Sequence, residues 1–204
     1  SLVDAVRQIE EGLETIFHQP HQMRKEDLLG LLDGTHKVVR IEKGKAEQEV
    51  GTLSATIDLD ANPSLPFSGA TIEEHKKGGK VTIEKRADGL YIDGHKVVLR
   101  LSERQVNGKT IQGHELRREL DGKQVLNVGV LDFLMANQSF VPDEMKKDAK
   151  GNTVYTFFWG TIYRNSSGLL YVRYCDWNDG EPKQDYNWLG DEWYFKNPAA
   201  CLAK

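Results

Sequence analysis

The chain has 204 residues and a formal net charge of −4, with 39% hydrophobic and 28% charged residues. This composition is typical of an ordinary globular protein with one good core, or a domain with a smaller companion, and it gives no reason to expect a nucleic-acid partner. No apolar run is long enough to cross a bilayer, residues 1–17 are too acidic for a signal peptide, and two cysteines build no disulfide framework. We therefore expect no membrane insertion, and the compartment stays open.

The first 35 residues are predicted to be helical. Apolar residues spaced four and three apart place one stripe on a helix, formed by Leu2, Val6, Ile9, Leu13 and Ile16. Pro20 ends this helix, and residues 24–34 are predicted to form a second, shorter one that ends at Gly34. The stripe either docks on the body of the protein or forms an oligomer seam.

From residue 36 to residue 101 the apolar pattern changes to a period of two, which is typical of strands. The predicted strands are residues 36–43, 51–60, 80–86, 90–94 and 95–102. Asp88-Gly89 and Asp93-Gly94 indicate hairpin turns, and Pro63, Pro66 and Gly69 indicate a loop. The basic cluster at 75–80 is interpreted as a solvated turn.

The second half of the chain mixes helices and strands. Residues 113–122 and 127–138 are predicted to be short helices, and the second has an apolar face formed by Val130, Leu131, Leu134 and Met135. A polar loop at 142–152 leads to predicted strands at 153–164 and 169–177, which a turn at 165–168 joins. Residues 199–204 are the last predicted strand.

Aromatic residues are concentrated near the C-terminal end, where 13 of the 18 Phe, Trp and Tyr residues lie between Tyr155 and Phe195. Burial of one indole removes on the order of 200 Å² from water, which stabilises by roughly 5 kcal/mol before costs. Residues 173–197 otherwise consist largely of turn-forming residues, so this segment is predicted to be a long irregular loop anchored by tryptophans. The predicted scaffold is Trp159, Trp177, Trp188 and Trp193.

Three blocks resemble the variable proteins of diversity-generating retroelements: "VLNVGVLDFLMANQSFVPDEMKK" (125–147), "FFWGTIYRNSSGLLYVRY" (157–174) and "NPAACLAK" (197–204). The resemblance covers roughly residues 110–204. It implies a C-type lectin fold of the α+β class, with two helices, a mostly antiparallel sheet, paired terminal strands and a ligand-binding face built by the C-terminal segment. In that family a reverse transcriptase copies a template repeat, misincorporates at adenines, and the copy replaces the variable segment of the gene.

Codon arithmetic connects this mechanism to the tryptophan pattern. Tryptophan has the single codon TGG, which contains no adenine, so Trp177, Trp188 and Trp193 would stay fixed. Asparagine codons are AAC and AAT, and changes at their adenines yield Asp, Tyr, Ser, Gly, His and Cys without a stop codon. The predicted variable positions are Tyr174, Asp176, Asn178, Asp179, Asp185, Asn187, Gly190, Asp191 and Tyr194. Tyrosines would supply rigid contact area and Asn or Asp adaptable hydrogen bonds, on a loop preorganised by the indoles.

These inferences define the expected organisation. Residues 1–89 would be an accessory element of helices and strands, and residues 90–204 a C-type lectin-like domain with its variable region at about 173–197. We expect a non-enzymatic protein without cofactor or metal, which binds a protein surface through its C-terminal face and is displayed on a virion or a cell surface. The N-terminal helix could add an oligomer contact.

Two other classes of function stay open. In a glycan-binding module, exposed Trp and Tyr faces would stack on sugars, and residues 177–179 with Glu181-Pro182 are similar to calcium motifs of sugar-binding C-type lectins. In those lectins, however, the Glu-Pro element lies on an earlier loop and is followed by an uncharged residue, not by Lys183. A hydrolase would need a carboxylate pair among Glu181, Asp185, Asp191 and Glu192, which we expect to be solvated instead. Cys175 and Cys201 are expected to be buried and unreactive.

Overall fold

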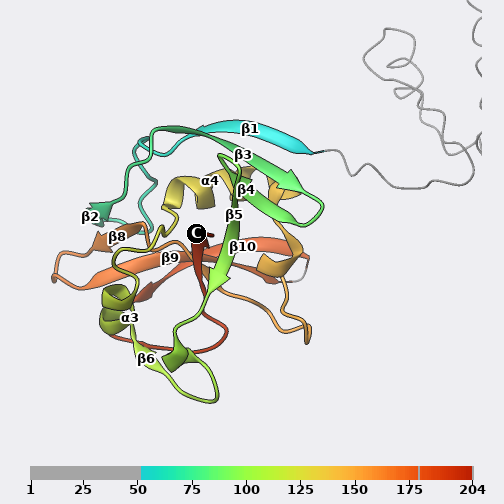
Figure 1. Cartoon of the computed structure of the whole chain (residues 1–204). Helices are drawn as coiled ribbons and strands as arrows, with labels where there is room; N and C mark the ends of the chain where they lie inside the picture. The colour runs from blue at the N-terminus through green and yellow to red at the C-terminus, as the bar shows by residue number, and fades with distance from the viewer. Residues whose placement is uncertain (1–51, 179, 204) are drawn as a thin grey trace, which may run out of the picture. The chain divides into compact units, whose positions relative to one another are not determined.

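The computed structural model describes residues 52–178 and 180–203 (Figure 1). The predicted helices at 1–17 and 24–34 and the predicted strand at 36–43 lie outside the described residues, and so does the oligomer contact expected from the first helix. Residues 50–204 form one compact unit.

In chain order, strands β1 to β5 come first, the helices and 3₁₀ turns follow with β6 among them, and strands β7 to β12 come last. The strands are β1 (Leu53–Asp58), β2 (Thr71–His75), β3 (Lys80–Arg86), β4 (Gly89–Ile92), β5 (His95–Arg100), β6 (Ile111–Gln112), β7 (Thr156–Phe157), β8 (Thr161–Arg164), β9 (Leu170–Asn178), β10 (Glu181–Trp188), β11 (Glu192–Trp193) and β12 (Ala199–Leu202). The helices are α3 (Gly113–Glu119) and α4 (Val128–Ala136), with 3₁₀ turns η2 (Glu103–Gln105), η3 (Gln138–Phe140) and η4 (Asp143–Met145).

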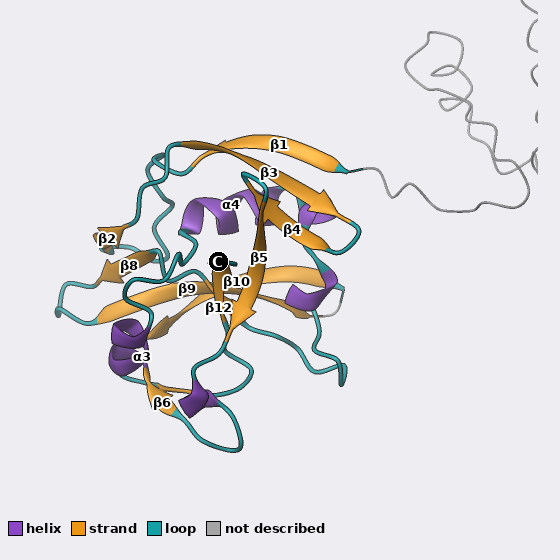
Figure 2. Cartoon of the chain, viewed as in Figure 1, coloured by secondary structure: helices purple, strands orange, loops and turns teal. Residues whose placement is uncertain are grey.

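The sheet is almost entirely antiparallel (Figure 2). Its main path runs β1-β3-β4-β5-β12-β7-β9-β8-β2, and β10 pairs with β9 outside that path. Only β12 and β7 run parallel, at the single pair Ala199 and Phe157, while β11 and β6 form a separate pair. The described residues therefore form an α+β fold with a mostly antiparallel sheet and two α-helices, as the sequence predicts.

Two hydrophobic clusters lie on opposite sides of β9. Cluster 1 holds α4 and β3 residues together with Cys175, and cluster 2 holds Trp159, Trp193 and Val172. Successive strand side chains point to opposite faces, so Tyr171, Cys175 and Trp177 meet cluster 1, whereas Leu170, Val172 and Tyr174 meet cluster 2. Figure 2 shows α4 and α3 on the two sides of β9. This strand thus contacts cluster 1 from Tyr171 to Trp177 and cluster 2 from Leu170 to Tyr174.

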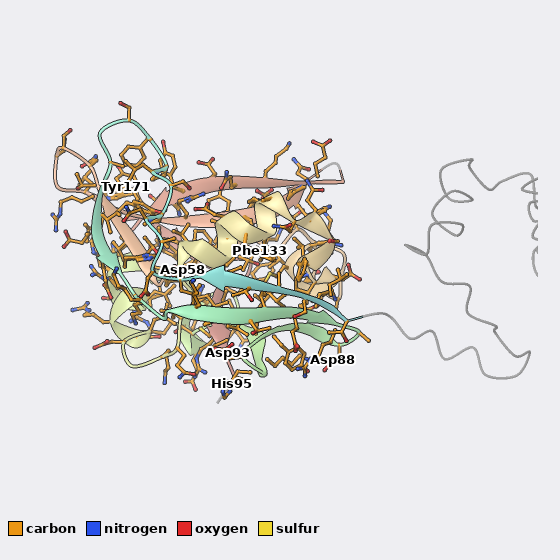
Figure 3. The ribbon with its side chains drawn as sticks, turned by 90° about the horizontal axis from the view of Figure 1, so that it is seen from above. Asp58, Asp88, Asp93, His95, Phe133 and Tyr171 are labelled. Carbon is orange, nitrogen blue, oxygen red and sulfur yellow. The ribbon has the colours of Figure 1, made fainter. Side chains whose placement is uncertain are left out.

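The hairpins of the β3-β4-β5 meander follow from their turn residues. Asp93 and Gly94 have φ of 47° and 78°, as a two-residue turn between right-twisted strands requires, and Asp93 Oδ1 also accepts from the Thr82 N–H at 2.7 Å. The β3-β4 ladder closes at Arg86 and Gly89, so its turn residues are Ala87 and Asp88, one residue earlier than predicted. Figure 3 shows Asp88 and Asp93 at these turns.

The structure differs from the predicted division at residue 89. Strand β4 spans that position, and it pairs with β3 on one side and β5 on the other. Ile83 and Leu90, from the two sides of the predicted boundary, are fully buried in the same cluster. Residues 53–86 therefore share a core with the C-terminal part of the chain.

The predicted strand at 153–164 is interrupted between β7 and β8. A side chain at Gly160 would place its Cβ 2.7 Å from the Asn127 backbone nitrogen, so only glycine allows the two backbones to come this close. Gly160 N–H donates to Leu126 C=O at 2.8 Å, and Gly160 C=O accepts from the Lys76 N–H at 2.7 Å. The interruption therefore lets the chain bind the loop before α4 and the end of β2, and β2 itself was not predicted.

Asn127 connects three parts of the fold. Its side-chain oxygen accepts from the Gly129 N–H at 2.9 Å and caps α4. Its amide group donates to Leu59 C=O and to Lys76 C=O, each at 2.8 Å. Only 3% of the residue is exposed, so these bonds satisfy groups that water cannot easily reach.

Replacement of Asn127 by alanine should lower the free energy of unfolding by about 2–4 kcal/mol, because it removes a helix cap and leaves a buried carbonyl without its donor. Urea denaturation measures this change, and Gln124→Ala at an exposed position is the matched control. Asn127→Asp should be at least as destabilising as Asn127→Ala, because it keeps the cap but places a carboxylate against two carbonyl oxygens. A loss no larger than that of Gln124→Ala would contradict the assigned role.

Candidate functional site

The predicted irregular loop at 173–197 is for the most part a β-hairpin, so that prediction is wrong. Residues 181–188 form β10 and pair with β9 from Asn178 to Tyr171. The turn between the strands contains Gly180, which has φ of 85°. The ladder pairs the backbone groups of β10 that point toward β9, so tertiary pairing overrides the local preference of Asn and Asp for turns.

One side of this hairpin collects most of the predicted variable residues. Residues directly opposite each other in an antiparallel ladder share a face, and the relevant pairs are Tyr174 with Asp185, Asp176 with Lys183, and Val172 with Asn187. We call this side the polar hairpin face; it consists of Tyr174, Asp176, Asn178, Lys183, Asp185 and Asn187. Five of the nine predicted variable positions thus lie together on it. Val172, fully buried in cluster 2, lies at its base.

Burial governs the chemistry of the two inner residues of the polar hairpin face. Tyr174 packs on Phe157 with ring centroids 4.7 Å apart, and burial, reinforced by Asp185 and Asp176, raises the pKa of its hydroxyl to about 12. At neutral pH this hydroxyl is therefore protonated and can donate. Burial also raises the pKa of the Asp176 carboxyl, with Lys183 acting in the opposite direction.

The other predicted variable positions are distributed less uniformly. Tyr194 is 40% exposed and lies close enough to Tyr174 to affect its pKa, so it borders the polar hairpin face. The segment with Gly190 and Asp191 lies against the start of α3 instead, where Asp191 C=O accepts from the Gly113 N–H at 3.1 Å. Asp179 lies outside the described residues.

The four predicted scaffold tryptophans fall into three environments. Trp193 and Trp159 are 0% and 3% exposed in cluster 2, with ring centroids 4.9 Å apart, as a scaffold role requires. Trp177 is partly buried on cluster 1, and Lys146 Nζ lies 4.9 Å from its ring centre. Trp188 is 38% exposed, so its predicted burial is wrong. It lies opposite Tyr171 in the ladder, on the side of the hairpin that faces away from cluster 2.

Trp188 lies over Gly190. A Cβ at Gly190 would come within 2.2 Å of the indole carbon Cζ2. A side chain at this predicted variable position therefore has to displace the indole, so position 190 is not independent of its neighbour.

A buried arginine, missed by the sequence interpretation, holds the opposite side of the hairpin. Arg173 is 4% exposed, and its guanidinium donates to Asp132 Oδ1 and Ser64 Oγ, each at 2.8 Å, and to Gln184 Oε1. Arginine in an otherwise apolar strand and aspartate in an apolar helix were the signals that could have identified this pair. The network joins β9, β10, α4 and the loop at residue 64.

The two cysteine thiols of the chain are buried. Cys175 and Cys201 are each 3% exposed, and burial raises their pKa values to about 12 and about 11, so both are neutral, unreactive thiols as expected. Within 52–178 and 180–203, no three His, Cys, Asp or Glu side chains come together in a way that could hold a metal ion. No helix in the described part of the chain has the length and apolarity needed to cross a membrane.

No model of a protein family, no curated protein and no solved structure matches this chain. Functional inference therefore rests on the geometry of the polar hairpin face and on the resemblance of the C-terminal sequence blocks.

Substitution of Gly190 by serine should move the Trp188 indole further into water. Acrylamide quenching of Trp188, obtained as the difference between proteins with and without Trp188→Phe, should increase in the Gly190→Ser background. The free energy of unfolding should fall by less than about 1 kcal/mol, because the indole is already partly exposed. Asp191→Ser is the matched control, and equal quenching in both variants would contradict the contact.

Asp176→Asn should stabilise the protein more at neutral pH than in acid. A folded-state pKa above the unfolded value means that the stability contributed by the protonated carboxyl is fully present below the unfolded pKa of about 3.9 and is lost as pH rises through the folded value. The asparagine variant does not titrate there, so its advantage over the unmodified protein should grow with pH. Urea denaturation across this range, with Asp121→Asn as the charge-matched control, measures the difference. An advantage that grows toward acid would contradict the raised pKa.

Proposed function

We propose that this chain is a non-enzymatic ligand-binding protein with a C-type lectin-like fold, whose C-terminal surface is diversified by adenine-directed mutagenic retrohoming. The observation that carries the proposal is the common orientation of Tyr174, Asp176, Asn178, Asp185 and Asn187 on the polar hairpin face. Strand alternation and the β9-β10 register bring these predicted positions together as one exposed row.

Several features of the fold support this proposal. Strands β5 and β12 pair antiparallel from Val97 to Arg100, which corresponds to the paired terminal strands that the resemblance implies. Helices α3 and α4 follow β5 in the chain, and the β9-β10 hairpin belongs to the C-terminal segment that the resemblance assigns to ligand binding. Fold-level likeness does not name a ligand, so the ligand has to be inferred from the surface itself.

The packing separates positions that can change from positions that cannot. Asn178, Lys183 and Asp185 are exposed, and the backbone beneath them is held by the β9-β10 ladder. Arg173 and Cys175 alternate with the residues of the polar hairpin face along β9, and Val172 lies at the base of that face. All three are buried. Substitution on the polar hairpin face therefore alters contact chemistry at little cost in packing, much as in antibody loops on a rigid scaffold.

A protein surface is the ligand that suits this face. Two paired strands present a broad row of side chains, whereas small molecules favour concave, mostly apolar pockets. Tyr174 and Tyr194 supply rigid aromatic area, and the Asn and Asp side chains supply hydrogen bonds at the rim, which matches the composition of adaptable protein-binding surfaces. Display on a virion or a cell surface follows from the same proposal.

A glycan-binding module is the second candidate, and exposed aromatic rings favour it. Trp188 and Tyr186 are 38% and 37% exposed. Tyr186 also lines a hollow of about 330 Å³, together with Phe67, Ser68, Gly69, Asn165, Ser166 and Tyr171. Figure 3 shows Tyr171 at this end of the molecule. Aromatic faces beside amide and hydroxyl groups suit a sugar ring, and this hollow is on the side of the hairpin opposite to the polar hairpin face.

The proposed division between variable and fixed positions predicts unequal costs of substitution. A triple variant, Asn178→Ser with Asp185→Asn and Asn187→Ser, should keep its thermal midpoint within about 4 °C of the unmodified protein, because none of these side chains is in a cluster. Trp193→Ala should cost about 3–5 kcal/mol, because it empties the centre of cluster 2. A triple variant as unstable as Trp193→Ala would contradict the proposal.

The genetic part of the proposal is tested by reading the DNA beside the gene. A near-identical repeat should differ from codons 174–194 chiefly where the repeat has adenine, and a reverse transcriptase gene should lie nearby. If neither is present, the proposal that this surface is diversified is wrong.

For the second candidate, glycan binding, Trp188→Ala should abolish binding to a glycan array, whereas the triple variant should bind the array unchanged.

A further inference from the structure

A cavity of about 590 Å³ lies between the end of β2, helix α3 and the segment around Trp159. It is lined by Glu74, Lys76, His114, Arg117, Arg118, Leu120, Asp121, Val125 and Trp159. None of these residues belongs to the polar hairpin face. The volume is typical of pockets that hold small organic molecules.

Cationic groups dominate the polar part of this lining. Arg117 and Glu74 form an ion pair at 2.7 Å across the cavity, which neutralises one charge of each sign and ties α3 to β2. Asp121 Oδ1 accepts from the Gly122 N–H at 3.0 Å. By contrast, the side chains of Lys76 and His114 have no hydrogen-bond or ion-pair partner among the described residues. The cavity thus carries more positive groups than its own carboxylates can pair.

Arg118 adds another cation that is only weakly engaged. Its guanidinium lies 4.0 Å from Glu115, and its side chain is 77% exposed at the cavity rim. Exposed ion pairs at such a distance contribute little, so Arg118 is free to turn toward a ligand.

The apolar part of the lining includes a donor without an acceptor. Leu120 and Val125 are buried, and Trp159 is 3% exposed. The Trp159 Nε1–H is buried and has no hydrogen-bond partner among the described residues. This nitrogen is shielded from water, so a ligand in the cavity would contact the indole ring and not the N–H.

The position of Lys76 is fixed by its backbone. Its N–H donates to Gly160 C=O at 2.7 Å, and its C=O accepts from Asn127 at 2.8 Å. Gly160 follows Trp159 directly, so the bonds that hold the lysine backbone also hold it beside the indole. The base of the lysine side chain and the indole that lines the cavity are therefore held next to each other.

We propose that this cavity binds a small organic anion, in which a carboxylate or phosphate group pairs with Lys76, His114 and Arg118 and an apolar portion contacts Trp159, Leu120 and Val125. A bare inorganic ion would fill only a fraction of the volume and would leave the apolar lining uncovered. The site does not depend on the proposed function of the polar hairpin face, and either can fail without the other.

Titration with phenyl phosphate and with benzoate tests the proposal and separates the two anionic groups. The readout is the indole N–H signal of Trp159 in a ¹⁵N–¹H correlation spectrum, assigned with Trp159→Phe. We expect a saturable shift of this signal with at least one of the two anions, and the stronger of them identifies the preferred group. Benzyl alcohol, which is neutral, and sodium chloride at equal ionic strength should produce no saturable shift.

A charge-matched pair of variants tests the role of the cations. Lys76→Met with Arg118→Gln should weaken binding of the preferred probe by about tenfold or more, because charge-assisted hydrogen bonds are lost. The control, Lys109→Gln with Lys150→Gln, removes the same charge from exposed positions outside the cavity. Because distant charges are screened by salt, this control should change the affinity by no more than about twofold. No saturable shift with either anion, equal binding of benzyl alcohol, or equal loss in both double variants would overturn the proposal.

Discussion

The buried guanidinium of Arg173 is the interaction on which the rest of the structure depends. A charge taken out of water costs several kcal/mol unless it is paired and its donors are satisfied. Here the donors reach Asp132 on α4, Ser64 in the loop after β1, and Gln184 on β10. The Ser64 carbonyl also accepts from Arg173 at 3.2 Å and from the Tyr163 hydroxyl at 3.0 Å. The helix, the loop and the hairpin must therefore be in place together, since the absence of any one would leave the arginine with an unmet donor.

This constraint gives the hairpin two unlike sides. On the side of Arg173, residues of β9 alternate into cluster 1, and Trp177 and Cys175 fill the space over α4. On the other side, cluster 2 covers only the first part of β9, up to Tyr174, and leaves Asp176 and Asn178 beyond its edge. The polar hairpin face thus exists because one cluster is shorter than the strand that it covers. A rigid backbone and a solvated row of side chains follow from the same packing.

Sequence patterns predicted the elements whose periodicity is local and missed those that depend on distant partners. Strand β3, both α-helices and the Asp93-Gly94 turn follow directly from alternation, apolar spacing and turn chemistry. Strand β10 could not be read in this way, because its Asn, Asp and Gln residues adopt strand geometry only through pairing with β9. Trp193 and Trp159 behave as large apolar residues usually do, whereas the exposure of Trp188 reflects its place in the ladder. The Arg173 network joins residues up to 109 positions apart, a separation at which single-sequence patterns carry no signal.

The outer edge of β10 shows how such a hairpin avoids self-association. Arg173 C=O accepts from the Phe158 N–H, so the backbone groups of Arg173 point away from β10. Tyr186 lies opposite Arg173 in the antiparallel ladder, and its N–H therefore points away from β9. The Tyr186 N–H donates to Asp185 Oδ1 at 2.8 Å. Pro182, four residues earlier on the same outer edge, has no N–H. With two of its outward positions unable to donate, this edge is a poorer template for strand addition, which protects against aggregation. Short acceptors such as Asp, Asn and Ser at position 185 preserve the block, whereas a tyrosine there would open the edge and tie the solubility of the protein to the identity of one residue.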